Sequence, residues 1–241
     1  KLGLEDDYSY NTQSDGLIEV LVDAKINIEP LNKQRILQWH KALFPTGSSG
    51  LREINVGAYR TDSEDMQIVS GAWNREKIHY VAPPSNQVEE MMEKFIVWIN
   101  SEHNLSPLYK AAIAHLYFVL IHPFDDGNGR IARVITDYVL SQSSLSKSNF
   151  YSISTIIYKM RKEYYAILDK VCIQTNQDIS VWMTWFIHLL ETSIDVTLTD
   201  IQVIQSKTMF WDKHIETKLN DRQKKSLLKC LHIYPKRSKV E

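Results

Sequence analysis

The segment from His122 to Arg133 concentrates the side chains of this chain that could do chemistry. It reads His-Pro-Phe-Asp-Asp-Gly-Asn-Gly-Arg-Ile-Ala-Arg. Pro123 disfavours helical geometry at His122, so the apolar helix before it should stop there. A new helix should begin near Asn128. The segment is therefore predicted to be a tight turn between two helices, with a histidine at its start and two arginines just beyond it.

The residue types of this turn fit a phosphate site. Gly127 and Gly129 let the backbone approach a ligand closely, and the N–H groups of a helix start favour an anion such as phosphate. Arg130 and Arg133 lie three residues apart on one helix face and add bidentate phosphate donors. Asp126 is a hard oxygen ligand suited to Mg²⁺, which normally arrives with the phosphates of a nucleotide.

His122 is the one group of this turn that can take a proton near neutral pH. Taken singly, each residue is more often structural: a helix start, surface arginines, and a histidine that ends a helix. Together they provide a phosphate cradle, a metal ligand and a base within one turn. These are the parts that phosphoryl or nucleotidyl transfer needs.

Helical patterns dominate the rest of the chain. Two short β-branched runs, 66–71 and 78–81, predict one β-hairpin, and the segment 45–50 is a loop by composition. The fold class is therefore mainly α with a small hairpin. We expect helices at 15–28, 33–43 with Asn32 as cap, 88–99, 108–121, 128–141, 154–173 and 178–205 with Asp178 as cap.

Composition and charge argue against several classes of protein. Lysine plus arginine total 28 and aspartate plus glutamate 29. The net charge of the chain is therefore close to zero and does not favour binding to nucleic acid or to an acidic membrane. The apolar stretch 111–121 is too short to span a bilayer. Cys172 and Cys230 have no zinc-type spacing and form no disulfide framework, so we expect a cytoplasmic protein without a membrane partner.

The turn matches His-Pro-Phe-x-Asp-Gly-Asn-Gly-Arg-x-x-Arg at every defined position, and this is the signature of the Fic proteins. The resemblance covers roughly residues 15–195. It implies an N-terminal helical segment (1–30), a Fic catalytic domain (31–206) and a C-terminal helical tail (207–241). The further matching segments are 51–60, 67–71, 82–84, 152–154, Arg161, 164–165 and 182–186.

The resemblance implies a protein adenylyltransferase that uses ATP and Mg²⁺. His122 would deprotonate a Ser, Thr or Tyr hydroxyl of a target protein, and that oxygen would attack the α-phosphate while pyrophosphate leaves. Asp126 would hold Mg²⁺, and Phe124 would turn inward and anchor the turn. The nucleotide-binding residues would be Gly127, Asn128, Gly129, Arg130, Arg133, Tyr164 and Tyr165.

The hairpin would be a flap that docks the protein substrate by β-strand addition. Its docking residues would be Gln67, Ile68, Val69, Ser70 and Gly71; a purely structural hairpin is the alternative. One of the two adjacent tyrosines is as well explained as a core residue, because neighbouring helix positions face different directions. His40, His103, His115 and His188 are interpreted as structural.

Three further expectations come from the ends of the chain. Many Fic proteins carry an inhibitory Ser/Thr-x-x-x-Glu-Gly/Asn helix, and the chain shows this motif at neither end, so we expect that helix upstream of Lys1 and a released enzyme here. The tail resembles the first helix of a winged-helix module, which leaves DNA open as a partner. A homodimer through the outer helices is also open.

Two other functions fit the same residues. One is a different reaction at the same site, either removal of AMP from a modified protein or transfer of another phosphate-containing group. The other is a nucleotide-sensing regulator without catalysis. Arg130 and Arg133 favour a triphosphate donor, and His122 argues against mere binding because binding needs no base.

Overall fold

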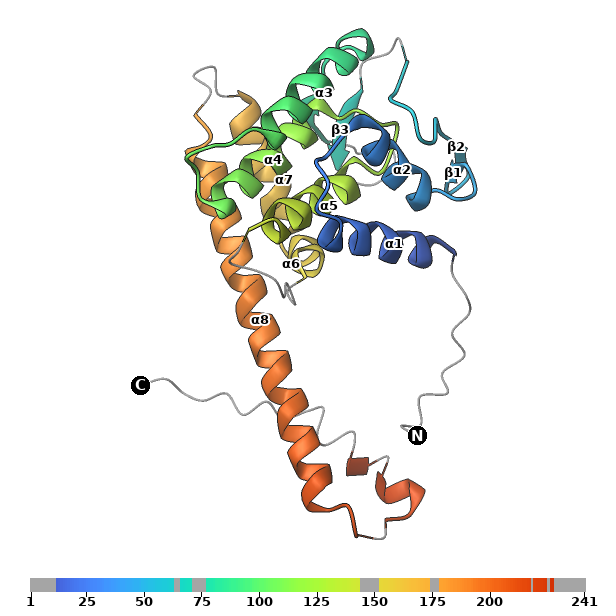
Figure 1. The fold of residues 1–241 in the computed structure, drawn as a ribbon, viewed down its shortest axis with the longest axis vertical. Helices are drawn as coiled ribbons and strands as arrows, with labels where there is room; N and C mark the ends of the chain where they lie inside the picture. Colours follow the sequence, from blue (N-terminus) through green and yellow to red (C-terminus); the bar gives the residue numbers. More distant parts are fainter. Residues whose placement is uncertain are drawn as a thin grey trace.

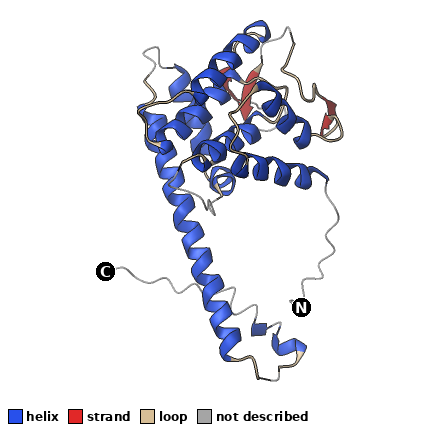
Figure 2. Ribbon diagram, viewed as in Figure 1, coloured by secondary structure: helices blue, strands red, loops and turns tan. Residues whose placement is uncertain are grey.

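The helix α4 (Pro107–Ile121) forms the centre of the fold, and most of its residues from Ala111 to Ile121 are buried. Ser106 caps it by accepting a hydrogen bond from the Tyr109 N–H, and Pro107 occupies its first turn, where a missing N–H costs nothing. An apolar helix of this kind is stable in water only if other helices cover every side. The helices α3, α5 and α8 contact α4 and cover its buried part (Figures 1 and 2).

The neighbours of α4 surround it in a helical body. The helix α5 (Asn128–Ser141) packs antiparallel along it, and α1 (Thr12–Ile26) and α2 (Lys33–Leu43) cover the outer side of α5. The helix α3 (Ser85–Asn100) packs directly on α4. The structure describes residues 12–62, 66–70, 77–143, 152–173, 178–217, 219–224 and 226–227.

The last helices close the remaining side of α4. The helix α6 (Ile153–Lys159) packs on α8 (Ser180–Lys213), and α7 (Arg161–Ile173) packs on both α8 and the strand β4. The single helix predicted for 154–173 is therefore wrong in detail. The hydrogen bonds continue through Met160, from its N–H to the Ile156 carbonyl and from the Tyr164 N–H to its own carbonyl. The chain nevertheless divides into two helices at Met160. The reason is their packing, because α6 contacts α8 whereas α7 contacts both α8 and β4.

The predicted hairpin is confirmed. The strands β3 (Gln67–Ser70) and β4 (Lys77–Val81) pair antiparallel, with Gln67 opposite Val81 and a register irregularity after Ile68. A second small ladder was not expected. The strand β1 (Ser48–Ser49), which lies in the predicted loop 45–50, pairs with β2 (Arg52–Glu53) just beyond it, because Gly50 adopts a left-handed φ of 60° that allows a two-residue turn.

Most predicted helix limits are confirmed. Asn32 caps α2 through a 2.9 Å bond from the Arg35 N–H to its side-chain oxygen. Asp178 accepts a bond from the Ser180 N–H, although the residue in the cap position is Ile179. The helix α8 continues to Lys213 without a break at the expected tail boundary after residue 206. None of the described helices is long and apolar enough to cross a membrane.

A buried hydrogen-bond chain joins α4, α5 and α7 in the core. The Thr136 hydroxyl donates to the Ala132 carbonyl at 2.9 Å, so its oxygen accepts from His115 Nδ1 at 3.0 Å. His115 Nε2 is then left to accept from the Tyr164 hydroxyl at 3.3 Å. Burial lowers the pKa of His115 to about 3, which keeps the ring neutral. The prediction that His115 is structural agrees with these contacts.

Arg35 fixes the connection between α1 and α2. It is 6% exposed, and its guanidinium donates to the Asp23 carboxylate at 2.7 Å and to the Glu29 carbonyl at 2.7 Å. A further nitrogen donates to the carbonyls of Asp23 and Asn27. These bonds tie Arg35 to the last turn of α1 and to the carbonyls of Asn27 and Glu29 in the connection that follows it.

Replacing Arg35 with glutamine should therefore lower the free energy of unfolding by about 2–3 kcal/mol, because it removes the charged partner of Asp23 and the donor to the Asn27 and Glu29 carbonyls. Urea unfolding followed by circular dichroism measures this change. A loss below about 0.5 kcal/mol, the usual range of surface substitutions, would contradict the assigned role.

Candidate active site

His122 ends α4 in a left-handed conformation, with φ 50° and ψ 59°. Among the residues that the structure describes, it is the one non-glycine residue with a positive φ. Its N–H still bonds to the Phe118 carbonyl at 3.0 Å, so the helix is closed at the same residue where the chain turns away. Such a conformation costs about 1–3 kcal/mol, so surrounding contacts must hold it.

The ring of His122 is in the tautomer that a base requires. Its Nδ1 lies 3.2 Å from the Val119 carbonyl oxygen. A carbonyl can only accept, so Nδ1 carries the proton and Nε2 keeps a free lone pair. Burial lowers the pKa of His122 to about 4, and the positive charge of Arg60 acts in the same direction. The neutral, proton-accepting form therefore prevails at neutral pH.

The turn after His122 is closed by Asn128. The Phe124 N–H donates to its side-chain oxygen at 2.9 Å, and its amide nitrogen donates to the Phe124 carbonyl at 2.7 Å. Asn128 is 2% exposed, so both ends of its side chain are used inside the turn. Any ligand contact from Asn128 would therefore come from its backbone. Phe124 is fully buried, as the expectation of an inward anchor required.

His40 on α2 supports the turn from below. Its ring stacks on Phe124 at 3.9 Å between centroids and 7° between planes. The Gly57 N–H donates to Nδ1 at 3.0 Å, so Nε2 carries the proton and donates to the Asp126 backbone carbonyl at 3.1 Å. His40 was expected to be structural, and the structure makes it a direct support of the turn. The sequence predicted that His40 lies on a helix, but not that it contacts Phe124 and the Asp126 carbonyl.

Gly127 is required at the start of α5. Its φ is 82°, and an added Cβ would lie 2.7 Å from a ring carbon of Phe44. No side chain caps α5, so its first N–H groups can bind an anion. Gly129 differs, since a Cβ there would meet only Arg133 at an ordinary 3.6 Å. A small side chain at Gly129 would therefore contact only the end of Arg133.

The two arginines are both half-buried beside this helix start. The Arg130 guanidinium lies 4.3 Å from the centroid of the Phe44 ring, a cation–π contact that orients it. Arg133 faces Tyr164, Tyr165 and Asp137. Burial lowers the pKa of both arginines, but an arginine stays charged at neutral pH. Two desolvated positive charges therefore flank the anion-binding end of α5.

The two predicted adenine-site tyrosines differ in burial. Tyr164 lies in the core against Trp182 and Trp185, and its hydroxyl is used by His115. Tyr165 is half-buried and contacts the Tyr164 ring at 5.5 Å between centroids. Of the two side chains, that of Tyr165 is the one with exposed surface for a ligand. The binding role of both remains a prediction.

Asp126 offers a carboxylate at the mouth of the turn. One oxygen accepts from the Gly127 N–H, the other accepts from the Ser49 hydroxyl on β1, and the residue is exposed. No group of three or more His, Cys, Asp or Glu side chains that could cage a metal occurs in the described part of the chain. A single carboxylate fits Mg²⁺, which is usually held by one or two carboxylates together with water and phosphate oxygens.

Arg60 ends the matched segment 51–60, where no role was predicted for it, yet it holds the turn to the rest of the body. It is 2% exposed, and its Nε donates to the His122 carbonyl at 2.8 Å. Another guanidinium nitrogen donates to the Pro83 carbonyl, and the backbone N–H of Arg60 donates to the Pro123 carbonyl at 2.9 Å. Arg60 therefore fixes the carbonyls of His122 and Pro123 and joins them to the segment that follows β4.

The hairpin is connected to the same region. The Ala82 N–H donates to the Met66 carbonyl at 2.8 Å, and the Ser85 hydroxyl donates to the Asp62 carbonyl at 2.7 Å. Of the predicted docking residues, Gln67 to Ser70 form β3, whereas Gly71 lies outside the described residues. Docking of a target on this hairpin remains a prediction.

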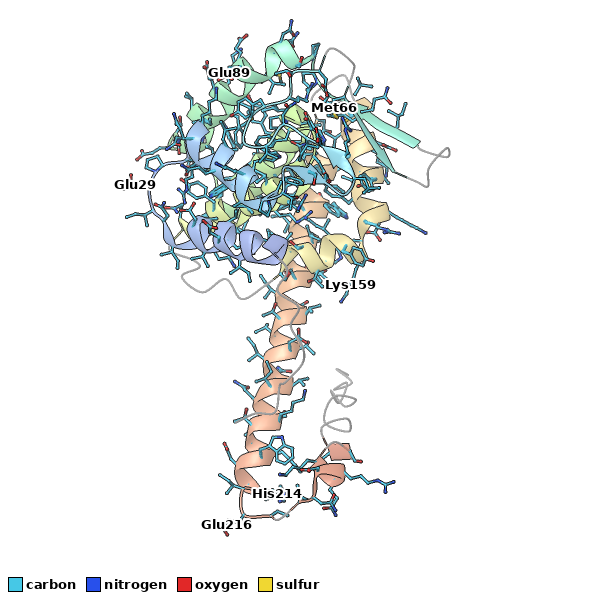
Figure 3. All side chains as sticks on the ribbon, turned by 90° about the vertical axis from the view of Figure 1, so that its right-hand side faces the viewer. Glu29, Met66, Glu89, Lys159, His214 and Glu216 are labelled. Carbon is cyan, nitrogen blue, oxygen red and sulfur yellow. The ribbon has the colours of Figure 1, made fainter. Side chains whose placement is uncertain are left out.

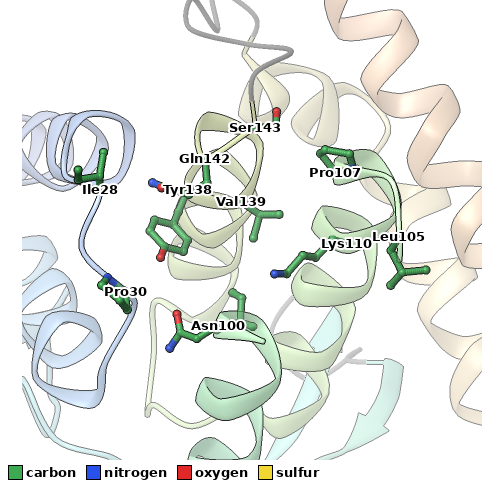
Figure 4. Close-up of a pocket in the computed structure, with 11 residues that line it drawn as sticks. Ile28, Pro30, Asn100, Leu105, Pro107, Lys110, Tyr138, Val139, Gln142 and Ser143 are labelled. Carbon is green, nitrogen blue, oxygen red and sulfur yellow. The ribbon is translucent and has the colours of Figure 1, made fainter. Parts of the chain in front are cut away.

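A separate hollow of about 330 Å³ lies at the other end of the α4–α5 pair (Figure 4). Lys110 from the start of α4 and Tyr138 from the end of α5 line it, and Lys110 donates to the Ser101 carbonyl at 3.1 Å. None of its lining residues belongs to the turn 122–133. The candidate site is therefore the turn and not this hollow.

Comparison with known proteins points to the same turn. Residues 30–140 match the family model described as Fic/DOC family. The protein adenylyltransferase Fic of Drosophila virilis is 30% identical over 136 residues, which cover 54% of this chain and 26% of that protein. The chain thus matches about a quarter of the length of this curated relative.

Solved structures share the fold. A Fic family protein from Desulfovibrio desulfuricans superposes with a TM-score of 0.61 at 20% identity, over 87% of this chain and 55% of that one. Fic-1 from C. elegans superposes with a TM-score of 0.57 at 23% identity, over 79% of this chain and 52% of that one. The expected fold class, a helical Fic-type domain with a small hairpin, is confirmed.

The burial of His122 makes a pH prediction. Its folded pKa of about 4 lies below the ordinary 6.5, so the unfolded chain binds this proton first as the pH falls. His122 should stay neutral down to well below pH 6, and its share of stability should be lost between about pH 6.5 and 4. Carbon chemical shifts of labelled histidine rings measure this. A midpoint near 6.5 for His122 would contradict the assignment.

Replacing Arg60 with glutamine should move the titration of His122 to higher pH, because a neighbouring positive charge is removed. Arg35→Gln is the matched control, since Arg35 is also a buried arginine bonded to backbone carbonyls but has no contact with His122. Both variants should unfold more easily. Only the Arg60 variant should change the histidine titration, and an equal change in both would reduce Arg60 to a purely structural residue.

Proposed function

Residues 30–140 form a Fic/DOC family domain, and from this premise we propose that the chain is a protein adenylyltransferase. It transfers AMP from ATP to a Ser, Thr or Tyr hydroxyl of a target protein and releases pyrophosphate. The reaction follows the name of the curated relatives, which share only part of their length with this chain. The argument below therefore depends on the chemistry of the chain's own residues.

One observation carries the proposal: a neutral histidine with a free Nε2 stands at the turn that leads into an uncapped helix start. The base and the phosphate site are thereby parts of one rigid turn. His122 Nε2 takes the proton of the target hydroxyl, the hydroxyl oxygen bonds to the α-phosphorus, and the bond to the pyrophosphate oxygen breaks. A nucleotide-sensing protein would need the helix start but not the base.

The chain's own groups meet the charge of the triphosphate. The Gly127 N–H already donates to the Asp126 carboxylate. The backbone N–H groups of Asn128 and Gly129 would bind phosphate oxygens, and Arg130 and Arg133 would bind the β- and γ-phosphates as bidentate donors. Asp126 would hold Mg²⁺, which supplies further neutralisation of the phosphates when bound. Tyr165 would pack beside the adenine. These donors stand in place before the substrate arrives, so little reorganisation is needed during the reaction.

The target would bind along the hairpin. An extended segment adds to the edge of β3, Gln67 to Ser70, through backbone hydrogen bonds. The base of this hairpin is tied to His122 through Pro83 and Arg60. Docking on β3 would therefore place a hydroxyl at a fixed position relative to the base. Backbone pairing reads little side-chain identity, so it admits several target sequences.

The test is transfer of label from ATP to protein. Label at the α-phosphate should become attached to protein in a lysate, whereas label at the γ-phosphate should not, because the γ-phosphate leaves with pyrophosphate. His122→Ala should lower the rate about 10²–10⁴-fold, since general base catalysis is lost. His188→Ala is the matched control, because His188 is an exposed histidine whose described ion pair is with Glu191 on the same helix.

Each other outcome has a defined meaning. Transfer from the γ position would replace adenylylation by phosphorylation. ATP binding without transfer to any protein would favour the regulator, and loss of AMP from pre-labelled protein would favour the reverse reaction. Equal rates for His122→Ala and the parent would overturn the role of the base.

A further inference from the structure

The small ladder of β1 and β2 is bonded to the turn that contains Asp126. It lies at one side of the body, to the right in Figure 1, and this side faces the viewer in Figure 3. The Ser49 hydroxyl on β1 donates to a carboxylate oxygen of Asp126, across 77 positions of the sequence. The sequence predicts only a loop at Ser49, so this contact joins an element without an assigned role to the candidate site.

The ladder directs the two serines of β1 to different partners. Successive side chains of a strand point to opposite faces. The Ser49 hydroxyl reaches Asp126, whereas the Ser48 hydroxyl lies 3.1 Å from the Thr46 hydroxyl. The pairing with β2 and the two-residue turn at Gly50 fix this register. Of these two adjacent hydroxyls, that of Ser49 is therefore the one that contacts the turn.

The base of the ladder is held in place as well. The backbone N–H and the side-chain amide of Asn55 both donate to Asp125 Oδ2 at 2.9 Å. The Ile54 N–H donates to the Gly47 carbonyl at 3.3 Å, and the Gly47 N–H donates to the Phe44 carbonyl at 3.1 Å. The segment is thus bonded both to the turn and to the end of α2, which fixes the position of β1 relative to the turn.

The two carboxylate oxygens of Asp126 are held by different parts of the chain. The Gly127 N–H donates to Oδ1 at 2.5 Å, and the Ser49 hydroxyl donates to Oδ2. Asp126 is exposed, so without such bonds its side chain would rotate freely in water. An ionised carboxylate can accept about four hydrogen bonds. Each oxygen therefore keeps a lone pair for a cation while the protein sets the direction of the group.

We propose that Ser49 is a positioning residue of the candidate site, because its hydroxyl orients the Asp126 carboxylate for the Mg²⁺ that accompanies ATP. The inference rests on the proposed function, which makes Asp126 the ligand of this ion. Ser49 acts through the carboxylate and not by contact with the nucleotide. The loss of a hydrogen-bond partner of a metal ligand typically lowers metal affinity about 10–100-fold. We expect the lower end of this range, since Gly127 still holds one oxygen.

The test is the gain in ATP affinity that Mg²⁺ provides. The dissociation constant of ATP is measured by isothermal titration calorimetry in excess EDTA and in excess Mg²⁺. By linkage, the constant in EDTA divided by the constant in Mg²⁺ reports how well the ATP-bound protein holds the metal, relative to free ATP. Ser49→Ala should lower this ratio about tenfold relative to the parent chain and leave binding in EDTA unchanged. A purely structural defect would instead weaken binding under both conditions.

Three further variants define the result. Ser48→Ala is the matched control, because it removes the neighbouring hydroxyl, which contacts Thr46. Ser49→Thr keeps a hydroxyl on β1, so both variants should have the ratio of the parent chain. Asp126→Asn should lower the ratio at least as far as Ser49→Ala. Adding Ser49→Ala to Asp126→Asn should change nothing further, since Ser49 acts only through Asp126. Thermal unfolding followed by circular dichroism checks that all variants are folded.

The outcomes separate this inference from the proposed function. If Asp126→Asn lowers the ratio and Ser49→Ala does not, Asp126 holds the metal without Ser49, and the inference alone is overturned. If Ser49→Ala weakens ATP binding equally in EDTA and in Mg²⁺, Ser49 is a structural residue, which also overturns the inference alone. If Asp126→Asn leaves the ratio unchanged, or the parent chain binds no ATP, the metal site of the proposed function is wrong and the inference with it.

Discussion

The left-handed conformation of His122 is the constraint on which the site depends. A residue with φ 50° at the end of α4 turns the chain out of the helix, while its ring bonds back to the Val119 carbonyl. The conformation is unfavourable for a residue with a side chain, so the protein must enforce it. Arg60 does this from one side by bonding to the His122 carbonyl, and the Phe118 carbonyl does it from the other by holding the His122 N–H.

The support of the turn is aromatic as well as polar. The ring of His40 stacks on Phe124 and also contacts the ring of Phe44. The guanidinium of Arg130 packs on the Phe44 ring. The Asn128 side chain bonds to both the N–H and the carbonyl of Phe124, so the backbone of the turn is held at this residue. The rings of α2 thereby shape a loop that lies far away in sequence. The same packing leaves room only for a glycine at position 127.

The sequence was informative where structure is local and silent where it is not. The helices α2 and α5 begin and end at the predicted residues, because caps, glycines and apolar spacing act within a few positions. Arg60 could not be predicted, since its bonds to His122 join residues 62 positions apart. The sequence indicated that one of Tyr164 and Tyr165 could be a core residue, but not which one. Adjacent positions on α7 face different directions, and only the packing of Trp182 decides which ring enters the core.

Desolvation links the base to the phosphate donors. The burial that lowers the pKa of His122 to about 4 also removes water from Arg130 and Arg133, and charges out of water act on each other over longer distances. Asp137 shows the strength of this effect, because burial raises its pKa to about 6 although Lys25 and Arg133 oppose the shift. A site of this kind has an excess of buried positive charge that an anion would relieve. The proposed triphosphate binding and the neutral histidine would therefore have one physical origin, the exclusion of water from the end of α4 and the start of α5.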